Sequence, residues 1–303
     1  MATGVAELRG LKRRLTAAFL VLAAAIAAGG FFYYRGYRAA LLRDAENLLR
    51  SVTVFKAAQI KYWRADNLER VDSLIDSPVL GASLAKFAAA PADRENAALL
   101  RARLEKFNHY NHFKRALLTD KDGKILLAAG GGDRGLCPDA LRLLKSAAGG
   151  GKARMGDIHP HPGTGVHGIH IAARAARSPT GAGLFLVLSI DPGKYLYPLV
   201  QQWPAYSPSA ETLLARREGA DVLYLNELRH VKGSALKLRF PVSSGLPVAA
   251  AARGQRGLLR GRDYRGVKVT AYADYIAETG WLLVNKVDEA EALAAAGGGD
   301  RGL

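Results

Sequence analysis

The most hydrophobic stretch of the chain lies close to its N-terminus. Residues 15–34 (LTAAFLVLAAAIAAGGFFYY) carry no charged side chain. At about 1.5 Å of rise per residue, such a helix is long enough to cross the hydrocarbon core of a bilayer. Basic side chains crowd residues 1–14, whereas those that follow the stretch are diluted by acidic ones. Because basic flanks stay in the cytoplasm, the pattern predicts a cytoplasmic N-terminus at 1–14 and a body on the outer side of the membrane.

A cleaved signal peptide is the alternative interpretation of the same stretch. Ala23 to Ala28 offers small-residue cleavage sites behind a basic region. However, the stretch is longer than the usual core of a signal peptide, and Phe31 to Tyr34 is placed to form an aromatic belt at the far interface. We therefore expect a single-pass anchor in the bacterial inner membrane. Either interpretation places the body in the periplasm or the extracellular space.

Beyond the anchor, residues 35–75 have the period of one long amphipathic helix. The apolar positions alternate spacings of four and three for about three heptads. We expect this stalk helix to pack on its own body or on the same helix of a second chain, and we favour a homodimer. The stripe consists of Leu41, Ala45, Leu48, Val52, Phe55, Gln59 and Tyr62.

Two further helices are predicted between the stalk and the first strands. The order Ser77-Pro78 is typical of a helix start. A second helix is expected from about Pro91 to Asn108, with Leu100 and Leu104 on one face.

From residue 115 the pattern changes to short strands, and the same order of elements occurs twice. Residues 115–129 predict a strand, a turn at Asp122-Gly123 and a second strand, and residues 212–227 repeat this plan with Glu218-Gly219 at the bend. Each hairpin is followed by a helix candidate, a Gly-rich passage and a closing strand pair. The closing pairs are expected at 165–175 with 184–191 and at 266–275 with 281–288. This order predicts a duplicated α+β unit built on antiparallel sheets.

The composition narrows the possible partners. In a cytosolic protein, a net charge of +16 would suggest that the partner is nucleic acid. The predicted membrane anchor argues against nucleic acid and favours membrane lipid or a small anionic molecule as the partner. General overuse of Arg, Ala and Gly is the plainer explanation of the charge. The single cysteine, Cys137, excludes an internal disulfide framework, and we expect it to be a lone thiol in a loop.

Several phrases in this order resemble double Cache sensor domains, which are extracytoplasmic ligand-binding modules of bacterial sensor histidine kinases, diguanylate cyclases and chemoreceptors. The phrases are 120–127 (DKDGKILL), 184–191 (LFLVLSID), 261–266 (GRDYRG) and 280–284 (GWLLV). Residues 195–230 resemble in particular the sensor regions that precede PAS-type histidine kinases.

The resemblance implies the arrangement of the body. After the stalk it implies two PAS-like subdomains in tandem, a membrane-distal one at 76–194 and a membrane-proximal one at 195–291, with a Gly-rich tail at 292–303. It also implies a small ligand held in the distal subdomain, whose binding moves the stalk.

The implied function is the input part of a signal-transducing receptor, with a sensor histidine kinase favoured. An envelope-anchored solute-binding or structural protein without signalling output is the alternative, and a periplasmic enzyme comes third. The sequence has no Gly-x-Ser-x-Gly elbow and no phosphate-binding loop, so we expect neither an enzyme nor a cofactor. Residues 295–303 repeat residues 128–136 (AAGGGDRGL), from which we expect a truncated or frame-disrupted product without its transmitter.

Four histidines within twelve residues are candidate metal ligands: His159, His161, His167 and His170. In an extended strand a spacing of three sends His167 and His170 to opposite faces, which weakens a four-ligand cluster. We therefore expect ordinary polar histidines and no metal.

The candidate ligand contacts lie in the distal subdomain. Arg115 and Arg154 are suited to clamp a carboxylate, although solvated surface charge is the plainer interpretation of each. The loop that starts at Asp157 is expected to fold over the pocket. The resemblance implies that Asp191 meets a ligand ammonium, but the same residue is suited to cap a helix that begins at Pro192.

The remaining candidates are aromatic or imidazole side chains. Trp63 and Tyr110 either wall the cavity or belong to the plain core. Double Cache sensors of amino acids have a cluster of arginine and aromatic side chains at the ligand. Tyr62, Trp63 and Arg64 are predicted in a helix and not in a strand, so they do not match that cluster. This departure argues against an amino-acid ligand. The full candidate set is Trp63, Tyr110, Arg115, Arg154, Asp157, His170 and Asp191.

Overall fold

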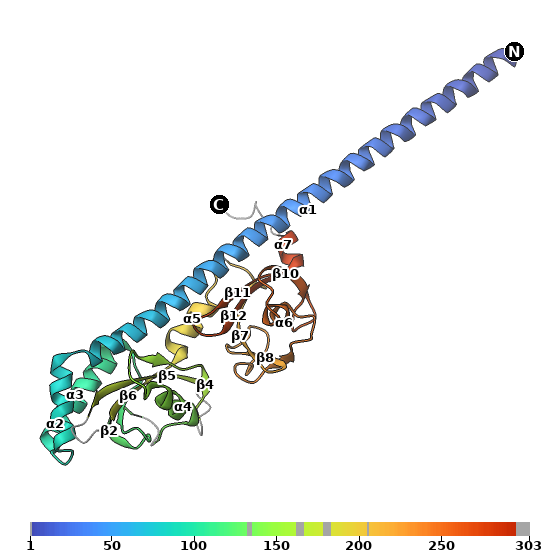
Figure 1. Ribbon diagram of the computed structural model, residues 1–303. Coiled ribbons are helices and arrows are strands. Elements are labelled where there is room, and N and C mark those ends of the chain that lie inside the picture. The colour runs from blue at the N-terminus through green and yellow to red at the C-terminus, as the bar shows by residue number, and fades with distance from the viewer. Residues whose placement is uncertain (1, 132–134, 162–166, 178–182, 205, 295–303) are drawn as a thin grey trace.

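The computed structural model consists of one long helix that carries two sheet-based subdomains along its length (Figure 1). It describes residues 2–131, 135–161, 167–177, 183–204 and 206–294. The repeated segment 295–303, on which the expectation of truncation rests, lies outside these residues. The α+β fold class, with two antiparallel sheets in tandem after an apolar N-terminal helix, is confirmed.

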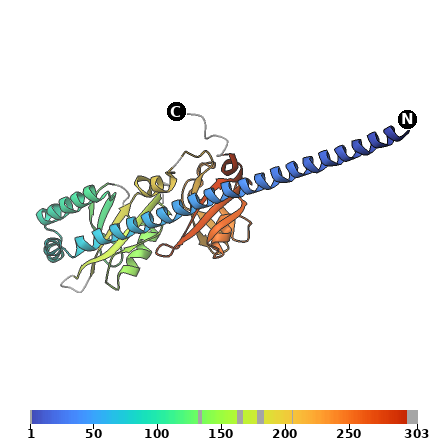
Figure 2. The ribbon, with the colours of Figure 1, turned by 90° about the horizontal axis from the view of Figure 1, so that it is seen from above.

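Helix α1 (Ala2–Ile75) is continuous from the apolar stretch to the far end of the molecule. Its side chains from Leu15 to Ala39 are exposed, so the apolar stretch contacts neither subdomain. By length and composition this helix is able to cross a membrane. Figure 2 shows the two subdomains following one another along its other half.

The face of α1 that packs on the body is rotated from the predicted stripe. Leu49, Ile60 and Val71 are almost fully buried, at spacings of eleven residues that keep one side of the helix inward. Of the predicted stripe, Val52 is buried, but Phe55 is 63% exposed. The sequence could not separate these two faces, because both are apolar. The exposed members of the predicted stripe are Leu48, Phe55 and Tyr62.

The distal subdomain begins with two helices that pack on one face of its sheet. Helix α2 spans Pro78–Ala89, and α3 spans Arg94–Asn111 with Asp93 as its N-cap. The Asp93 carboxylate accepts hydrogen bonds from the backbone N–H groups of Glu95 and Asn96. The cap fixes the start of α3 a few residues after the predicted start.

The distal sheet has the strand order β2-β1-β6-β5-β3, with β4 paired to β5. Its hairpin turn has Gly123 at φ +86°, as the Asp-Gly signal predicts. The strands are β1 (Arg115–Thr119), β2 (Ile125–Ala129), β3 (Arg154–Met155), β4 (His159–Pro160), β5 (His167–Arg177) and β6 (Gly183–Ile190), and helix α4 (Pro138–Ala147) lies between β2 and β3.

The two faces of the distal sheet are covered differently. The inner face, which includes Leu118, Leu186 and Ile171, packs on α1, α2 and α3. The outer face, which includes Leu117 and Val187, packs on α4. Both faces are therefore buried, which explains why β6 is a continuous apolar run and not an alternating one.

The proximal subdomain repeats the plan with the strand order β10-β11-β12-β7-β8-β9. Its turn after β7 has Gly219 at φ +61°. The elements are η1 (Pro192–Lys194), α5 (Leu196–Gln201), β7 (Glu211–Glu218), β8 (Asp221–Tyr224), β9 (Arg239–Pro241), α6 (Pro247–Ala252), β10 (Gly257–Arg262), β11 (Lys268–Ile276), β12 (Trp281–Asp288) and α7 (Glu289–Ala294).

A buried lysine fastens α1 to the proximal subdomain. The Lys56 ammonium, on a side chain 4% exposed, donates to the Val200 carbonyl at 2.5 Å and to the Thr212 hydroxyl at 2.7 Å. It also lies 5.2 Å from the centre of the Trp203 ring. Burial without a facing carboxylate among these contacts lowers the pKa of Lys56 to about 8.

This burial makes the stability of the fold depend on pH. Between pH 8 and 10.5 the unfolded chain holds a proton that the folded chain has lost at Lys56, so the free energy of unfolding rises with pH across that window. We expect the rise to be on the order of 3 kcal/mol and to be absent in Lys56→Met. Denaturant titrations of the full chain in detergent micelles measure it. The exposed Lys61→Met is the matched control on the same helix, and a rise that persists in Lys56→Met contradicts the assignment.

Candidate ligand-binding site

A row of polar side chains crosses the outer face of the distal sheet. Arg115 on β1 and His170 on β5 both pair with Ser189 on β6, which places the three residues side by side on that face. Their exposed fractions are 5% for Arg115, 9% for Ser189 and 2% for His170. Because buried polar groups lose their hydration, such a row on an otherwise apolar face calls for specific partners.

Cys137 reaches this row from the N-terminus of α4. It is the N-cap residue, with Pro138 at the first helical position, and its Sγ accepts a hydrogen bond from the Ala140 N–H at 3.4 Å. The side chain is 5% exposed. Cys137 is thus a free thiol in the loop that leads into α4, as predicted, but the capping geometry turns it inward onto the sheet.

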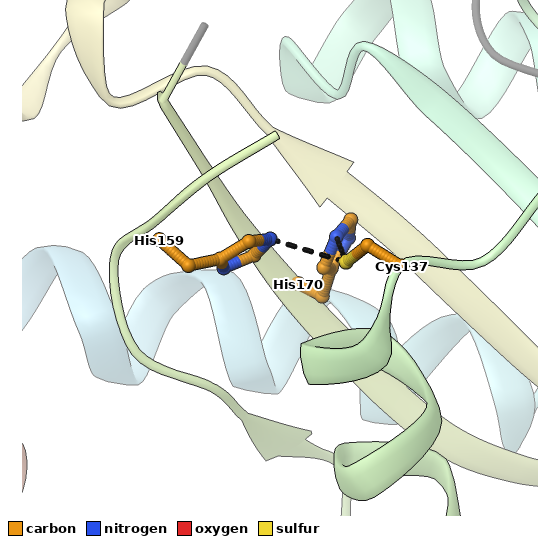
Figure 3. Close-up of side chains that lie close together, drawn as sticks. All are labelled: Cys137, His159 and His170. Atoms are coloured by element: carbon orange, nitrogen blue, oxygen red, sulfur yellow. Dashed lines mark hydrogen bonds between the residues drawn. The ribbon is translucent and has the colours of Figure 1, made fainter. Parts of the chain in front are cut away.

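His159 approaches the thiol from the opposite side. It lies on β4, which pairs with β5 so that His159 is opposite Gly168. The Nε2 atoms of His159 and His170 both lie 3.3 Å from the Cys137 Sγ, and the two rings are 4.8 Å apart between centres (Figure 3). We call Cys137, His159 and His170 the Cys-His cluster.

The other ring nitrogen of each histidine also has a partner. The Nδ1 of His159 lies 3.1 Å from the Asp157 carbonyl oxygen, and the Nδ1 of His170 lies 3.1 Å from the Ser189 hydroxyl. A carbonyl oxygen only accepts, so the proton of neutral His159 sits on Nδ1. Its Nε2 then presents a lone pair to the sulfur.

The cluster shifts the protonation of its members. Burial alone raises the pKa of the Cys137 thiol, but hydrogen bonds from His159 and His170 and from the Ala140 N–H lower it to about 5. For His159, burial lowers the pKa, but the hydrogen bond to the sulfur and the Asp157 carbonyl outweigh burial and raise the pKa above its ordinary value. The arrangement therefore favours a thiolate beside imidazole groups.

Arg115 supplies a buried cation at the other end of the row. Its Nη2 donates to the Gly135 carbonyl at 3.3 Å, so it contacts the segment that leads into Cys137. A guanidinium in such a place is suited to bind a carboxylate or another planar anion through parallel hydrogen bonds.

The segment that carries His159 is also fixed to the proximal subdomain. The Asp157 carboxylate accepts a hydrogen bond from the Trp281 indole N–H at 2.8 Å and pairs with the Arg216 guanidinium at 2.8 Å. Arg216 also donates to the Ile158 carbonyl at 3.0 Å. We call these contacts between Asp157, Arg216 and Trp281 the inter-subdomain clamp. It joins the candidate site to β7 and β12.

Only some of the predicted contacts come together. Arg115 and His170 share the polar row, and Asp157 lies next to it through His159. Arg154 lies at the sheet edge opposite Ala172, with its side chain exposed.

The other three predicted residues lie elsewhere. Trp63 faces inward from α1 and stacks on Tyr195, with 6.2 Å between the ring centres. Tyr110 is 67% exposed on α3. Asp191 caps the short helix η1, because its carboxylate accepts from the Gly193 N–H at 2.8 Å.

The sequence reasoning missed Cys137, His159 and Ser189 as site residues. The prediction that His167 and His170 face opposite sides is confirmed, since His167 bonds the Tyr197 hydroxyl at 2.8 Å while His170 meets Cys137. His170, which was predicted both as a candidate ligand contact and as an ordinary strand histidine, lies in the Cys-His cluster. The hydrogen-bond partner of His170 is Cys137, which lies 33 positions earlier in the chain and not on the same strand.

Comparison with known proteins establishes the fold. No family model and no curated protein matches this sequence. Among solved structures, the model is similar to the ligand-binding domain of Mlp24 with asparagine, at a TM-score of 0.58 and 13% identity over 87% of this chain and 98% of that one.

Two further chemoreceptor domains are similar. For Pseudomonas aeruginosa PAO1 PctB in complex with L-Arg the TM-score is 0.56, with 15% identity over 82% of this chain and 97% of that one. For Campylobacter jejuni Tlp3 in complex with L-norvaline it is 0.61, with 10% identity over 84% of this chain and 94% of that one. The body of the chain thus shares the fold of these ligand-binding domains, which is the double Cache fold that the sequence resemblance implied.

The inter-subdomain clamp predicts a measurable contribution to stability. Asp157→Ala removes both the Trp281 hydrogen bond and the Arg216 ion pair, and we expect it to lower the free energy of unfolding by about 1–3 kcal/mol. Denaturant unfolding of the full chain in micelles measures this loss. Glu278→Ala, which breaks an exposed 3.9 Å pair with Lys61, is the control and is expected to change stability by less than about 0.5 kcal/mol. Equal effects of the two substitutions contradict a specific clamp.

Proposed function

We propose that this chain is a membrane-anchored, extracytoplasmic sensor module for a small polar or anionic ligand, the input part of a signal-transducing receptor. The observation that carries the proposal is the buried row of Arg115, Ser189 and His170 on the outer face of the distal sheet. Packing alone does not require a cation, a hydroxyl and an imidazole at that place, and recognition of a polar ligand does. The apolar helix at 15–34 and the double Cache fold support the single-pass topology.

Signal transfer follows from the position of the clamp. A ligand on the polar row contacts the segment around His159, and Asp157 in the same segment is bound to β7 and β12 of the proximal subdomain. The proximal subdomain in turn packs on α1. Binding shifts the balance between two arrangements only by its difference in affinity for them, so the ligand must favour one position of this segment.

We further propose a homodimer through the stalk. Leu48, Phe55 and Tyr62 repeat every seven residues on α1 and are 45%, 63% and 73% exposed. A row of large apolar side chains with this period is typical of a helix that pairs with a second helix.

For the output we favour a sensor histidine kinase, because residues 195–230 resemble the regions that precede such kinases. A chemoreceptor is the second candidate, and the similarity to the chemoreceptor domains of Mlp24, PctB and Tlp3 favours it. Under both readings the module itself binds and moves without catalysing a reaction.

Ligand binding through Arg115 is tested by thermal shift of the full chain in micelles against small carboxylates, amines and amino acids. A compound that binds only the folded state at 100 times its Kd stabilises the chain by about 2.7 kcal/mol. We expect a carboxylate to raise the Tm and Arg115→Lys, which keeps the charge but loses the two-pronged geometry, to weaken its binding roughly tenfold or more. Arg142→Ala, an exposed arginine on α4, is the control. Equal binding by Arg115→Lys, or no shift with any compound, would count against the proposal.

The stalk dimer is tested by the mass of the protein in micelles or nanodiscs. Phe55→Glu puts a charge into the exposed row, and we expect it to convert a dimer to a monomer. Val54→Glu is the matched control, because Val54 is 54% exposed on the same helix but points about 100° away from Phe55. A wild-type monomer, or dimers of both variants, contradicts pairing through this row.

A further inference from the structure

We propose that the Cys-His cluster is a binding site for a single soft or borderline-soft transition-metal ion, Cu(I) or Zn(II). This names a ligand class for the distal subdomain, and it rests on the proposed function only for the claim that the ion is what the module senses. The site is formed by Cys137 at the start of α4, His159 on β4 and His170 on β5.

The geometry fits an ion at the centre of the three side chains. Their ligand atoms all lie within 4.8 Å of one another, and each Nε2 is 3.3 Å from the Sγ. Metal–sulfur and metal–nitrogen bonds of about 2.3 and 2.0 Å at tetrahedral angles require a separation of roughly 3.5 Å. The sulfur–nitrogen separations therefore need to change by only a few tenths of an ångström, and the two histidine nitrogens, which lie within 4.8 Å of each other, need to approach to roughly 3.3 Å.

Both imidazole rings direct their Nε2 atoms at the same sulfur. In the absence of an ion, each nitrogen either donates a proton to the sulfur or accepts the thiol proton. With its proton on Nδ1, His159 offers a lone pair there. One ion at this point accepts the sulfur and both nitrogen lone pairs together, and the thiol proton leaves to solvent as the metal–sulfur bond forms.

The groups behind the ligands are those that metal-binding histidines use. His159 donates its Nδ1–H to the Asp157 carbonyl, and His170 has the Ser189 hydroxyl at its Nδ1. Such outer hydrogen bonds fix the ring orientation and the tautomer that presents Nε2 to an ion. The Asp157 carbonyl thus holds neutral His159 in the metal-binding tautomer, and the Ser189 hydroxyl is able to accept the Nδ1–H of His170 in the same tautomer.

The donor set selects the kind of ion. One thiolate and two imidazoles suit Cu(I) and Zn(II), whereas Ca²⁺ and Mg²⁺ require oxygen ligands, which the cluster does not supply. A thiolate with Cu(I) is neutral, whereas a thiolate with Zn(II) leaves a positive charge in a buried site that already has Arg115 on the same row. Charge balance therefore favours Cu(I), and Zn(II) requires a further ligand such as water or an anion.

An ion in the cluster also acts on the clamp. It ties His159 to the sheet and to α4, and Asp157, two residues away, is bound to Arg216 and Trp281. The site is therefore able to report its occupancy to the proximal subdomain, which is what the proposed function requires.

The test is a titration of the reduced, metal-free full chain in micelles with Zn(II) chloride and, without oxygen, with Cu(I) in competition with a chromophoric chelator. We expect one ion per chain. Cys137→Ser keeps an N-cap oxygen for α4 but removes the soft ligand, and it should weaken binding more than about 100-fold, as should His170→Ala. Ser189→Ala, which removes only the outer hydrogen bond, should weaken binding about tenfold. His109→Ala, an exposed histidine on α3, should have no effect.

Co(II) provides a readout that does not depend on the variants folding. Bound to the wild-type cluster, it should show a thiolate-to-metal charge-transfer band. Absence of bound metal, a bound ion without that band, or unchanged affinity in the Cys137 and His170 variants would each overturn the inference.

A further comparison separates this inference from the proposed function. If an organic compound stabilises the chain through Arg115 while no metal binds, the metal site is refuted and the sensor proposal stands. If the metal binds but leaves hydrogen exchange in β7 and β12 unchanged, the site stands and its sensing role is refuted.

Discussion

Both subdomains complete their cores against the same straight helix, and this shared packing determines the rest of the structure. Leu49 belongs to the core beside α7, whereas Ile60, Trp63 and Val71 belong to the core that continues into the distal sheet. Between them, Lys56 bonds to α5 and β7 of the proximal subdomain. A helix that contributes to two cores cannot move relative to one without affecting the other, because close-packed interiors do not deform freely. A movement of one sheet is therefore transmitted to the other through α1, although the two sheets share no strands.

Much of this architecture could be predicted from the sequence, because it depends on local signals. The Asp122-Gly123 turn and the apolar run of β6 need only near neighbours to define them, and the structure has both where the pattern placed them. The side of α1 that faces the body could not be predicted in the same way. Phe55 and Ile60 are equally apolar, and only the position of the sheets determines that Ile60 is buried.

The candidate site shows the same limit more sharply. The alternation of side chains along β5 was enough to predict that His167 and His170 face opposite sides of the sheet. The meeting of Cys137, His159 and His170 depends on three elements brought together by tertiary packing, and no spacing along the chain encodes it. Trp63 follows the second of its two predicted roles, because it packs in the core and stacks on Tyr195. A large aromatic side chain alone does not distinguish a cavity wall from a core residue.

The single thiol of the chain lies where α4, β4 and β5 meet. A cysteine-directed reagent therefore modifies one position in the whole protein. Because the Cys137 side chain is 5% exposed, the reagent reaches it only when α4 or β4 moves away from the outer face of the sheet. The rate of labelling then measures how often the segments around Cys137 open, and no other cysteine contributes to the signal. Cys137 is thus a natural probe of local opening at the candidate ligand-binding site.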